Sequence, residues 1–211
     1  MRILIINPNS DLNTNNILKN KAELVLKDLS NISVEVMSIP EAPILVGSYM
    51  DYHKSANRMI DIVSKDEYDA YIIACHSDPN IDLIKEITQK PVIGIGEASF
   101  KVASMLGNSF IVISPSLKSE SKKRKLVRSY HLEDMFIGTV VTKSDSKEDL
   151  LAASEYGKQK YNPDTIVLGC ANYAMYDKDI EDKLGLPVID GVASAISMVV
   201  GLYNYWKYKN N

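Results

Sequence analysis

The sequence predicts an α/β fold made of two related halves, each a mainly parallel sheet flanked by helices. Three observations support this prediction. Short β-branched runs alternate with longer helical segments, three sequence patterns recur in the same order in both halves, and no low-complexity segment interrupts the alternation. With 211 residues, of which 45% are hydrophobic, the chain can bury a sizeable core.

Eight short apolar runs have the length and composition of buried strands, and continuous runs of this kind are typical of parallel sheets covered on both faces. The predicted strands, in chain order, are residues 3–6, 33–37, 70–74, 92–95, 110–113, 137–141, 165–168 and 188–189. Each is followed by a segment with apolar residues at helical spacing. The predicted helices are residues 11–29, 51–64, 79–88, 98–106, 119–130, 147–160, 174–184 and 192–207.

The internal repeat consists of three pairs of similar segments. They are an Asp, a strand and a Cys at 69–75 and 164–170, a Pro-Val-Ile start at 91–98 and 187–193, and a strand ending in a polar-Pro-polar turn at 4–10 and 111–117. Three matches in one order indicate a duplicated unit. We therefore expect a first half over residues 1–98, a second half over 99–189, and a C-terminal helix 190–211 that packs back on the first half.

Composition excludes several classes of function. The 24 Lys and Arg against 27 Asp and Glu give a formal net charge of −3, so we expect no nucleic-acid binding. No apolar run approaches the ~20 residues of a membrane span, and no secretory pattern follows Met1, so we expect no membrane association and a cytoplasmic location. A small molecule is the expected partner. Aromatic residues crowd the last helix and favour a homo-oligomer: Tyr203, Tyr205, Trp206 and Tyr208.

Only two cysteines occur, and they take the same place in the two halves. Cys75 and Cys170 lie far apart in sequence and match neither a disulfide scaffold nor a zinc site, so we expect free thiols and no metal. Both follow a predicted strand, where the ligand crevice of an open parallel sheet lies. An isolated free cysteine often only packs in a core, but the symmetric placement favours a functional pair.

Two thiols facing each other across a cleft suit one kind of chemistry. One thiolate can remove a proton from a carbon while the other thiol delivers a proton to the opposite face, which inverts a stereocentre without a cofactor. Cys75 and Cys170 are therefore candidate catalytic residues. His76 could instead pair with Cys75 for nucleophilic attack, but adjacent residues on an extended chain point in opposite directions, so we favour a hydrogen-bonding or pocket-lining role.

The segments INPNS at 6–10, ACHSDP at 74–79, PVIGIGEA at 91–98, VLGCA at 167–171 and LPVIDGVA at 186–193 resemble the aspartate/glutamate/hydantoin racemase superfamily, most closely its hydantoin racemase branch. This resemblance implies two pseudo-symmetric Rossmann-like domains, proton transfer without a cofactor, and Cys75 and Cys170 as the acid/base pair. It also implies a set of substrate-binding residues, which are Asn9, Ser77, Ser116 and Asn172. Asp78 would have a capping or orienting role.

The substrate that the resemblance implies is a 5-substituted hydantoin or an allantoin-like ring. His76-Ser77 and Asn172-Tyr173 depart from the family pattern beside the two thiols, which leaves two alternatives. One is a racemase of aspartate, glutamate or a broader range of amino acids, with His76 and Asn172 shaping a carboxylate site. The other is a non-catalytic small-molecule-binding protein with a redox-sensitive thiol pair.

Three local patterns have structural interpretations. Ser77 or Asp78 is expected to cap the helix that begins at Pro79. The basic run 122–125 is interpreted as a solvated helix face. The glycines at 94 and 96 lack the third glycine of a dinucleotide loop and are expected to form a structural turn.

Overall fold

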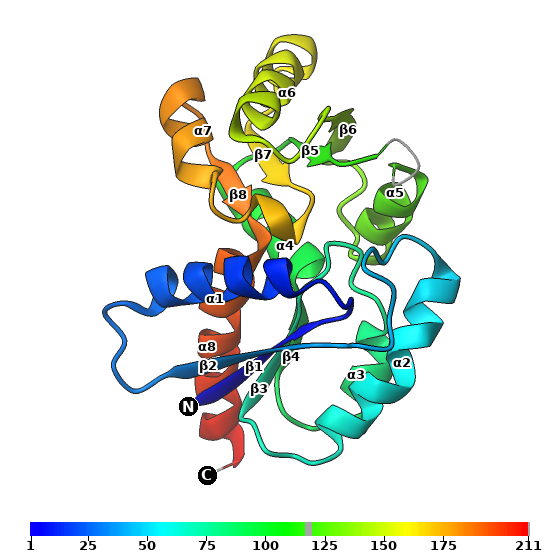
Figure 1. Ribbon diagram of the computed structural model, residues 1–211. Helices are drawn as coiled ribbons and strands as arrows, with labels where there is room; N and C mark the ends of the chain where they lie inside the picture. The colour runs from blue at the N-terminus through cyan, green and yellow to red at the C-terminus, as the bar shows by residue number, and fades with distance from the viewer. Residues whose placement is uncertain (117–119, 211) are drawn as a thin grey trace.

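The computed structural model describes residues 1–116 and 120–210, which form two four-stranded parallel sheets with helices around them (Figure 1). The first sheet contains β1 (Arg2–Asn7), β2 (Ser33–Ser38), β3 (Ala70–Ile73) and β4 (Val92–Gly94). The second contains β5 (Phe110–Ser114), β6 (Phe136–Val141), β7 (Thr165–Leu168) and β8 (Val188–Asp190). The predicted α/β fold is confirmed.

The helices in the described part also follow the predicted order. They are α1 (Leu12–Leu26), α2 (Tyr49–Val63), α3 (Ile81–Ile87), α4 (Ile95–Leu106), α5 (Glu120–Ser129), α6 (Lys147–Tyr161), α7 (Asp177–Leu184) and α8 (Gly191–Asn210), with a short 3₁₀ turn η2 (Ala171–Tyr173). The predicted helix 119–130 and the repeated segment 111–117 extend into residues outside the described part. No helix of residues 1–116 and 120–210 is long and apolar enough to cross a membrane.

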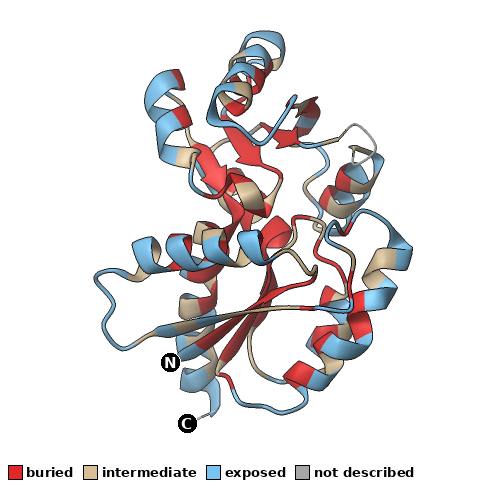
Figure 2. Ribbon diagram, viewed as in Figure 1, coloured by how far each residue is buried: buried red, intermediate tan, exposed pale blue. Residues whose placement is uncertain are grey.

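The two sheets have the same topology. Their strand orders are β2-β1-β3-β4 and β6-β5-β7-β8, and neighbouring strands are parallel throughout. Strands β1, β3 and β4 therefore correspond to β5, β7 and β8, which are the pairs that the sequence repeat predicts. Buried residues concentrate in these strands and on the inner faces of the helices (Figure 2).

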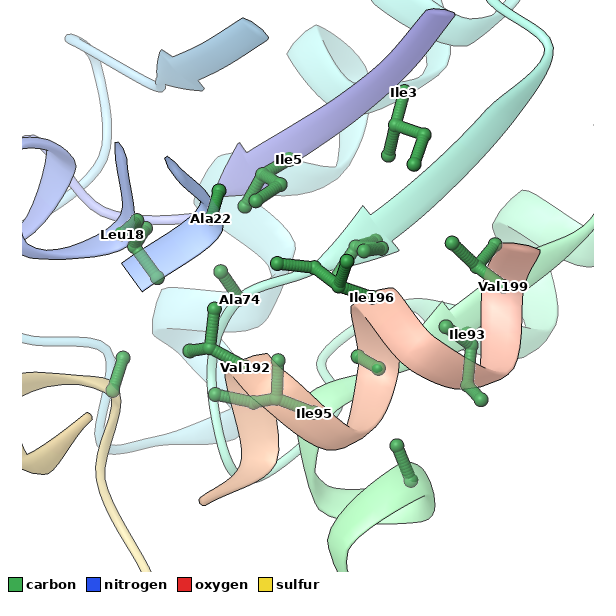
Figure 3. Packing of buried hydrophobic residues seen from close by; sticks show 14 of the residues in the cluster. Ile3, Ile5, Leu18, Ala22, Ala74, Ile93, Ile95, Val192, Ile196 and Val199 are labelled. Atoms are coloured by element: carbon green, nitrogen blue, oxygen red, sulfur yellow. The ribbon is translucent and has the colours of Figure 1, made fainter. Parts of the chain in front are cut away.

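Helices α4 and α8 connect the two halves, because each packs in the core of the half to which its preceding strand does not belong. Helix α4 follows β4 of the first sheet, but its Phe100 and Ala103 pack in the core cluster of the second sheet. Helix α8 follows β8 of the second sheet, but its Ile196 and Val199 pack in the core cluster of the first sheet (Figure 3). The two helices also contact each other. The boundary expected between residues 98 and 99 lies inside α4.

The exchanged helices begin side by side. A Cβ at Gly191 would lie 2.6 Å from the backbone oxygen of Ile95, so the first turns of α4 and α8 approach to a distance that only glycine allows. Ile95 and Gly191 each stand four positions after the proline of the Pro-Val-Ile repeat, Pro91 and Pro187. Equivalent positions of the two halves therefore meet here, and the pseudo-twofold axis passes between them.

Candidate active site

Cys75 and Cys170 take matching places at the ends of the equivalent central strands β3 and β7. Each begins a tight turn, because the N–H of Asp78 donates to the carbonyl of Cys75 at 2.9 Å and the N–H of Tyr173 donates to that of Cys170 at 3.1 Å. Both cysteines are free and partly exposed. The turns thus leave both thiols at the carboxyl edge of their sheets, where crevices form in this class of fold.

The two thiols have a similar electrostatic environment. Burial raises the pKa of the Cys75 thiol, and burial raises the pKa of Cys170 to about 11. The N–H two residues further along opposes this effect in each case, with Ser77 lowering the pKa of Cys75 and Asn172 lowering that of Cys170. Negative charge on Cys75 also raises the pKa of Cys170, so ionisation of the first thiol opposes ionisation of the second.

Lys123 of α5 connects the two cysteine loops. Its side chain is buried, with 3% of the residue exposed. Its Nζ lies 2.6 Å from Nδ1 of His76 and donates to the carbonyls of His76 at 2.8 Å and Gly169 at 3.2 Å. His76 follows Cys75 and Gly169 precedes Cys170, so one cation bridges both loops. Burial lowers the pKa of Lys123 to about 8, and the charge of Lys123 lowers the pKa of both thiols.

The ring of His76 points into the protein. Its Nε2 lies 3.0 Å from Oγ of Ser99, and the hydroxyl of Ser99 donates to the carbonyl of Gly96 at 2.9 Å. The ring also meets Phe100 edge to face, with centroids 5.1 Å apart. Burial, aided by the charge of Lys123, keeps the pKa of His76 well below its ordinary value, so the ring is neutral. His76 thus bonds to Lys123 and Ser99 through its two ring nitrogens.

Asp78 caps α4, not the helix that follows it. Its carboxylate accepts from the N–H groups of Gly96 at 2.9 Å and Glu97 at 2.6 Å and from the hydroxyl of Tyr130 at 2.8 Å. Burial raises the pKa of this carboxyl to about 6. The expected capping of the next helix by Ser77 or Asp78 is wrong: Asp78 and Asn80 have positive φ angles of 45° and 62°, and α3 begins only after Asn80.

The other substrate-binding residues that the sequence suggests also lie beyond the carboxyl ends of the strands. Ser77 lies beside Cys75, and its N–H and hydroxyl both lower the pKa of that thiol. In η2, Asn172 accepts through Oδ1 from the hydroxyl of Thr14 at 2.8 Å, which ties it to α1 of the first half. Asn9 follows β1 and accepts from the N–H of Asp11 at 2.8 Å. Ser116 follows β5 and is partly exposed.

A cavity of about 370 Å³ lies against the first cysteine loop, between α2, α3 and α5. Ser77 and Asp78 form one wall, and Tyr52 of α2 forms another. Tyr52 hydrogen-bonds to Ser77, and burial raises its pKa to about 12, while the negative charge of Cys75 acts in the same direction. The cavity thus adjoins the residues around the first thiol.

The interpretation of the basic run 122–125 as a solvated face is wrong for one of its members. Lys123 is buried, whereas Arg124 and Lys125 are exposed. The basic run nevertheless contains a helical pattern. Lys123, Val127 and Tyr130 lie at i, i+4 and i+7 and therefore share one face of α5. This spacing was the signal by which the sequence could have revealed a buried lysine.

Within residues 1–116 and 120–210, no group of three or more His, Cys, Asp or Glu side chains is arranged to hold a metal ion. The duplicated parallel fold, with one thiol at a central strand end of each half, defines a two-domain α/β protein. The chain belongs to the Asp/Glu/Hydantoin racemase family, whose model matches residues 3–199. The protein is therefore a racemase.

Named relatives share most of the chain. It is 31% identical to a hydantoin racemase of Pseudomonas sp. (strain NS671) over 209 residues, covering 93% of this chain and 83% of that protein. It is 29% identical over 216 residues to a hydantoin racemase of Paenarthrobacter aurescens, covering 96% and 91%. The structure of allantoin racemase from Klebsiella pneumoniae shares the fold, with a TM-score of 0.90 at 22% identity over 97% of this chain and 88% of that one.

Proposed function

We propose that the protein racemises a 5-substituted hydantoin or an allantoin-like ring without a cofactor, using Cys75 and Cys170 as the acid/base pair. The observation that carries this proposal is the presence of two free, partly exposed thiols at equivalent strand ends of a duplicated fold. The hydantoin racemases among its relatives support the ring as substrate.

In the proposed reaction the two thiols exchange roles. The cysteine that is ionised removes the proton from the carbon next to the ring carbonyl, and the negative charge spreads onto that carbonyl. The other cysteine, still protonated, delivers its proton to the opposite face of the carbon. Each turnover therefore ends with the protonation states reversed, so the enzyme accepts either enantiomer. The electrostatic coupling of the two thiols supports this scheme, because it favours one thiolate and one thiol over two thiolates.

The ring substrate is favoured on chemical grounds as well. In a hydantoin the reacting proton lies next to an amide carbonyl, whereas in a free amino acid it lies next to an ionised carboxylate that resists a second negative charge. A thiolate base can therefore form the carbanion of a hydantoin at a lower free-energy cost than the carbanion of a free amino acid. We assign the binding of the ring oxygens and N–H groups to four residues that follow the ends of strands. Asn9 follows β1, Ser77 follows β3, Ser116 follows β5, and Asn172 lies in η2 after β7.

The test follows each enantiomer separately in heavy water. Wild-type protein should introduce deuterium at the ring carbon as it racemises, and Cys75→Ser and Cys170→Ser should each lower racemisation by at least about 100-fold. The two variants control for each other: each should still exchange the proton of one enantiomer without inversion, and the preferred enantiomer should differ between them. Racemisation at the wild-type rate in either variant, or racemisation without incorporation of deuterium at the ring carbon, would contradict the two-thiol mechanism.

The substrate is tested with a panel of 5-substituted hydantoins, allantoin, aspartate and glutamate, followed by polarimetry. Activity on the rings supports the proposal. Activity on free amino acids alone would replace it with an amino-acid racemase. Inactivity on the whole panel, combined with ligand-induced thermal stabilisation and ready formation of a Cys75–Cys170 disulfide, would indicate a binding protein with a redox-sensitive thiol pair.

A further inference from the structure

Among residues 1–116 and 120–210, the buried side chain of Lys123 has hydrogen-bond contacts to neutral acceptors alone. Its Nζ meets Nδ1 of His76, the carbonyl of His76 and the carbonyl of Gly169. An ammonium has three N–H groups, so the three acceptors satisfy it completely. Burying a charge without a paired carboxylate is costly, which makes an ordinary structural role a poor explanation for a lysine here.

The surrounding hydrogen bonds hold Lys123 in its protonated form. When Lys123 is an ammonium, Nδ1 of His76 accepts from it, and Nε2 then carries the ring proton and donates to Ser99, whose hydroxyl donates to the carbonyl of Gly96. Every donor in this series of hydrogen bonds then has one acceptor. A neutral amine at Lys123 would instead have to accept from an N–H at Nδ1 of His76, and Ser99 would then have to donate to Nε2 and give up its hydrogen bond to the carbonyl of Gly96. The network therefore favours the ammonium and gives it a fixed position.

The position of Lys123 is shared by the two halves. One of its carbonyl partners comes directly after Cys75, and the other comes directly before Cys170. Either thiolate raises the pKa of Lys123, so the ammonium interacts favourably with negative charge on both sides. A reaction in which the ionised thiol alternates needs a cation that serves both thiols.

We propose that Lys123 is a positioning residue that ties the two cysteine loops together and supplies the positive charge that stabilises whichever thiol is ionised. This inference rests on the proposed acid/base role of Cys75 and Cys170. Lys123 does not transfer a proton to or from the substrate; it acts through the thiols, and His76 acts by holding Lys123.

Other titratable groups also face the thiols, and they act differently. Those facing Cys75 are Tyr52 and Asp78, and those facing Cys170 are Asp145 and Tyr173. The negative charge of Asp78 raises the pKa of Cys75, and that of Asp145 raises the pKa of Cys170. Lys123 lowers the pKa of both thiols, so its removal should affect both in the same direction.

The test measures the rate at which iodoacetamide alkylates each cysteine between pH 6 and pH 10, read from the two cysteine peptides by mass spectrometry. Lys123→Met removes the charge and all three hydrogen bonds. Lys123→Gln removes the charge but keeps amide donors for the carbonyls, and it serves as the second variant if Lys123→Met does not fold. Arg124→Met removes a neighbouring, exposed positive charge of the same helix and is the matched control.

At pH 7 we expect both Lys123 variants to alkylate at both cysteines roughly fivefold or more slowly than wild type, because less thiolate is present. Arg124→Met should match wild type. The difference should shrink above about pH 8, where wild-type Lys123 itself loses its proton. A merely structural role would not produce this dependence on pH.

Wild-type alkylation in a folded Lys123→Gln variant would overturn the charge role, whether or not Lys123→Met is slower. A slower rate at only one cysteine would overturn the sharing of the cation. Alkylation requires no turnover, so the result is independent of the proposed reaction. Slower alkylation in a protein that racemises nothing would contradict the proposed function alone, and racemisation with unchanged alkylation would contradict this inference alone.

Discussion

Asp78 and Asp190 are buried carboxylates that cap equivalent helices from different places in the repeat. Asp190 stands directly before α8 and accepts from the N–H of Ala193 at 2.6 Å. Its equivalent before α4 is Gly94, and there the carboxylate comes from Asp78 in the loop after β3. A Cβ at Gly94 would lie 2.0 Å from Oδ1 of Asp78. The glycine therefore leaves the space that the capping carboxylate of the first half occupies.

Gly94→Ala should lower the free energy of unfolding by about 2–4 kcal/mol, because the methyl group must displace a buried, hydrogen-bonded carboxylate. Gly201→Ala is the matched control. A Cβ at Gly201, on an exposed helical position, meets no atom within 4 Å, so this change should stabilise the protein by about 0.5–1 kcal/mol. Urea unfolding measures both. A neutral Gly94→Ala would mean that the Asp78 cap can move at little cost.

At the scale of single residues, local sequence patterns predict that the two cysteines lie at equivalent strand ends, but they do not predict the burial of Lys123. Cys75 and Cys170 end apolar runs of the same length, so their positions follow from local patterns. Lys123 lies within a run of four basic residues, and its burial depends on contacts with the carbonyls of His76 and Gly169, which are distant in sequence. Long-range polar contacts of this kind leave no local pattern except the shared helix face with Val127.

At the scale of elements, α1 of the first half is bound to the second half by a buried ionic cluster. Nζ of Lys21 lies 2.7 Å from Asp177 at the start of α7 and 3.8 Å from Asp190 at the end of β8. The hydroxyl of Thr14, about two turns before Lys21 on α1, donates to Asn172 of η2. Helix α1 thus contacts the second cysteine loop and the strand next to it, and it holds the halves in register at the site.

This cluster predicts a dependence of stability on pH. Burial raises the pKa of Asp190 to about 7, although Lys21 opposes the shift. The folded protein therefore keeps a proton that the unfolded chain, with a carboxyl pKa near 3.9, releases between about pH 4 and pH 7. The contribution of Asp190 to stability is greatest at about pH 4 and declines as pH rises to 7. The decline amounts to roughly 3 kcal/mol.

Asp190→Asn keeps an oxygen for the N–H of Ala193 and removes the titration. Urea unfolding of wild type and variant at pH 4.5, 6 and 7.5 measures the effect. The stability of wild type relative to Asp190→Asn should fall as pH rises through this range. A difference that is constant or increases with pH would show that Asp190 is already ionised in the folded protein.

The helix boundaries illustrate what local patterns leave out. The predicted start of α3 at Pro79 agrees with the preference of proline for a first helical turn. The carboxylate of Asp78 is instead drawn to α4, and the chain passes through two residues with positive φ before α3 begins at Ile81. The β-strands show no such conflict, because the apolar runs of most of them are buried, with β2 as the main exception. The predicted order of all eight is confirmed.

At the scale of the whole molecule, the exchange of α4 and α8 makes each core depend on the other half. Ile196 lies in α8, which follows the last strand of the second sheet, but it is fully buried in the core of the first sheet. We expect the two halves to unfold together, since removing either helix opens the opposite core. Far-ultraviolet circular dichroism, the fluorescence of Trp206 and the alkylation of Cys170 should give coincident urea transitions.

Ile196→Ala should shift all three transitions together and lower the free energy of unfolding by about 2–5 kcal/mol, because it opens a cavity in a packed core. Leu202→Ala, an exposed position on the same helix, is the matched control and should cost less than about 1 kcal/mol. Separate transitions, with exposure of Cys170 unaffected by Ile196→Ala, would contradict the coupling of the halves.

Ile95 and Gly191 approach closely at the pseudo-twofold axis, and two smaller chains could form the same arrangement. A polypeptide with only one repeat could complete its core by lending its last helix to a second copy and receiving the same helix in return. The result would be a helix-swapped dimer with one thiol per subunit and a single site at the interface. Joining the two copies in one chain keeps that geometry and allows equivalent positions to diverge, as Gly94 and Asp190 have done.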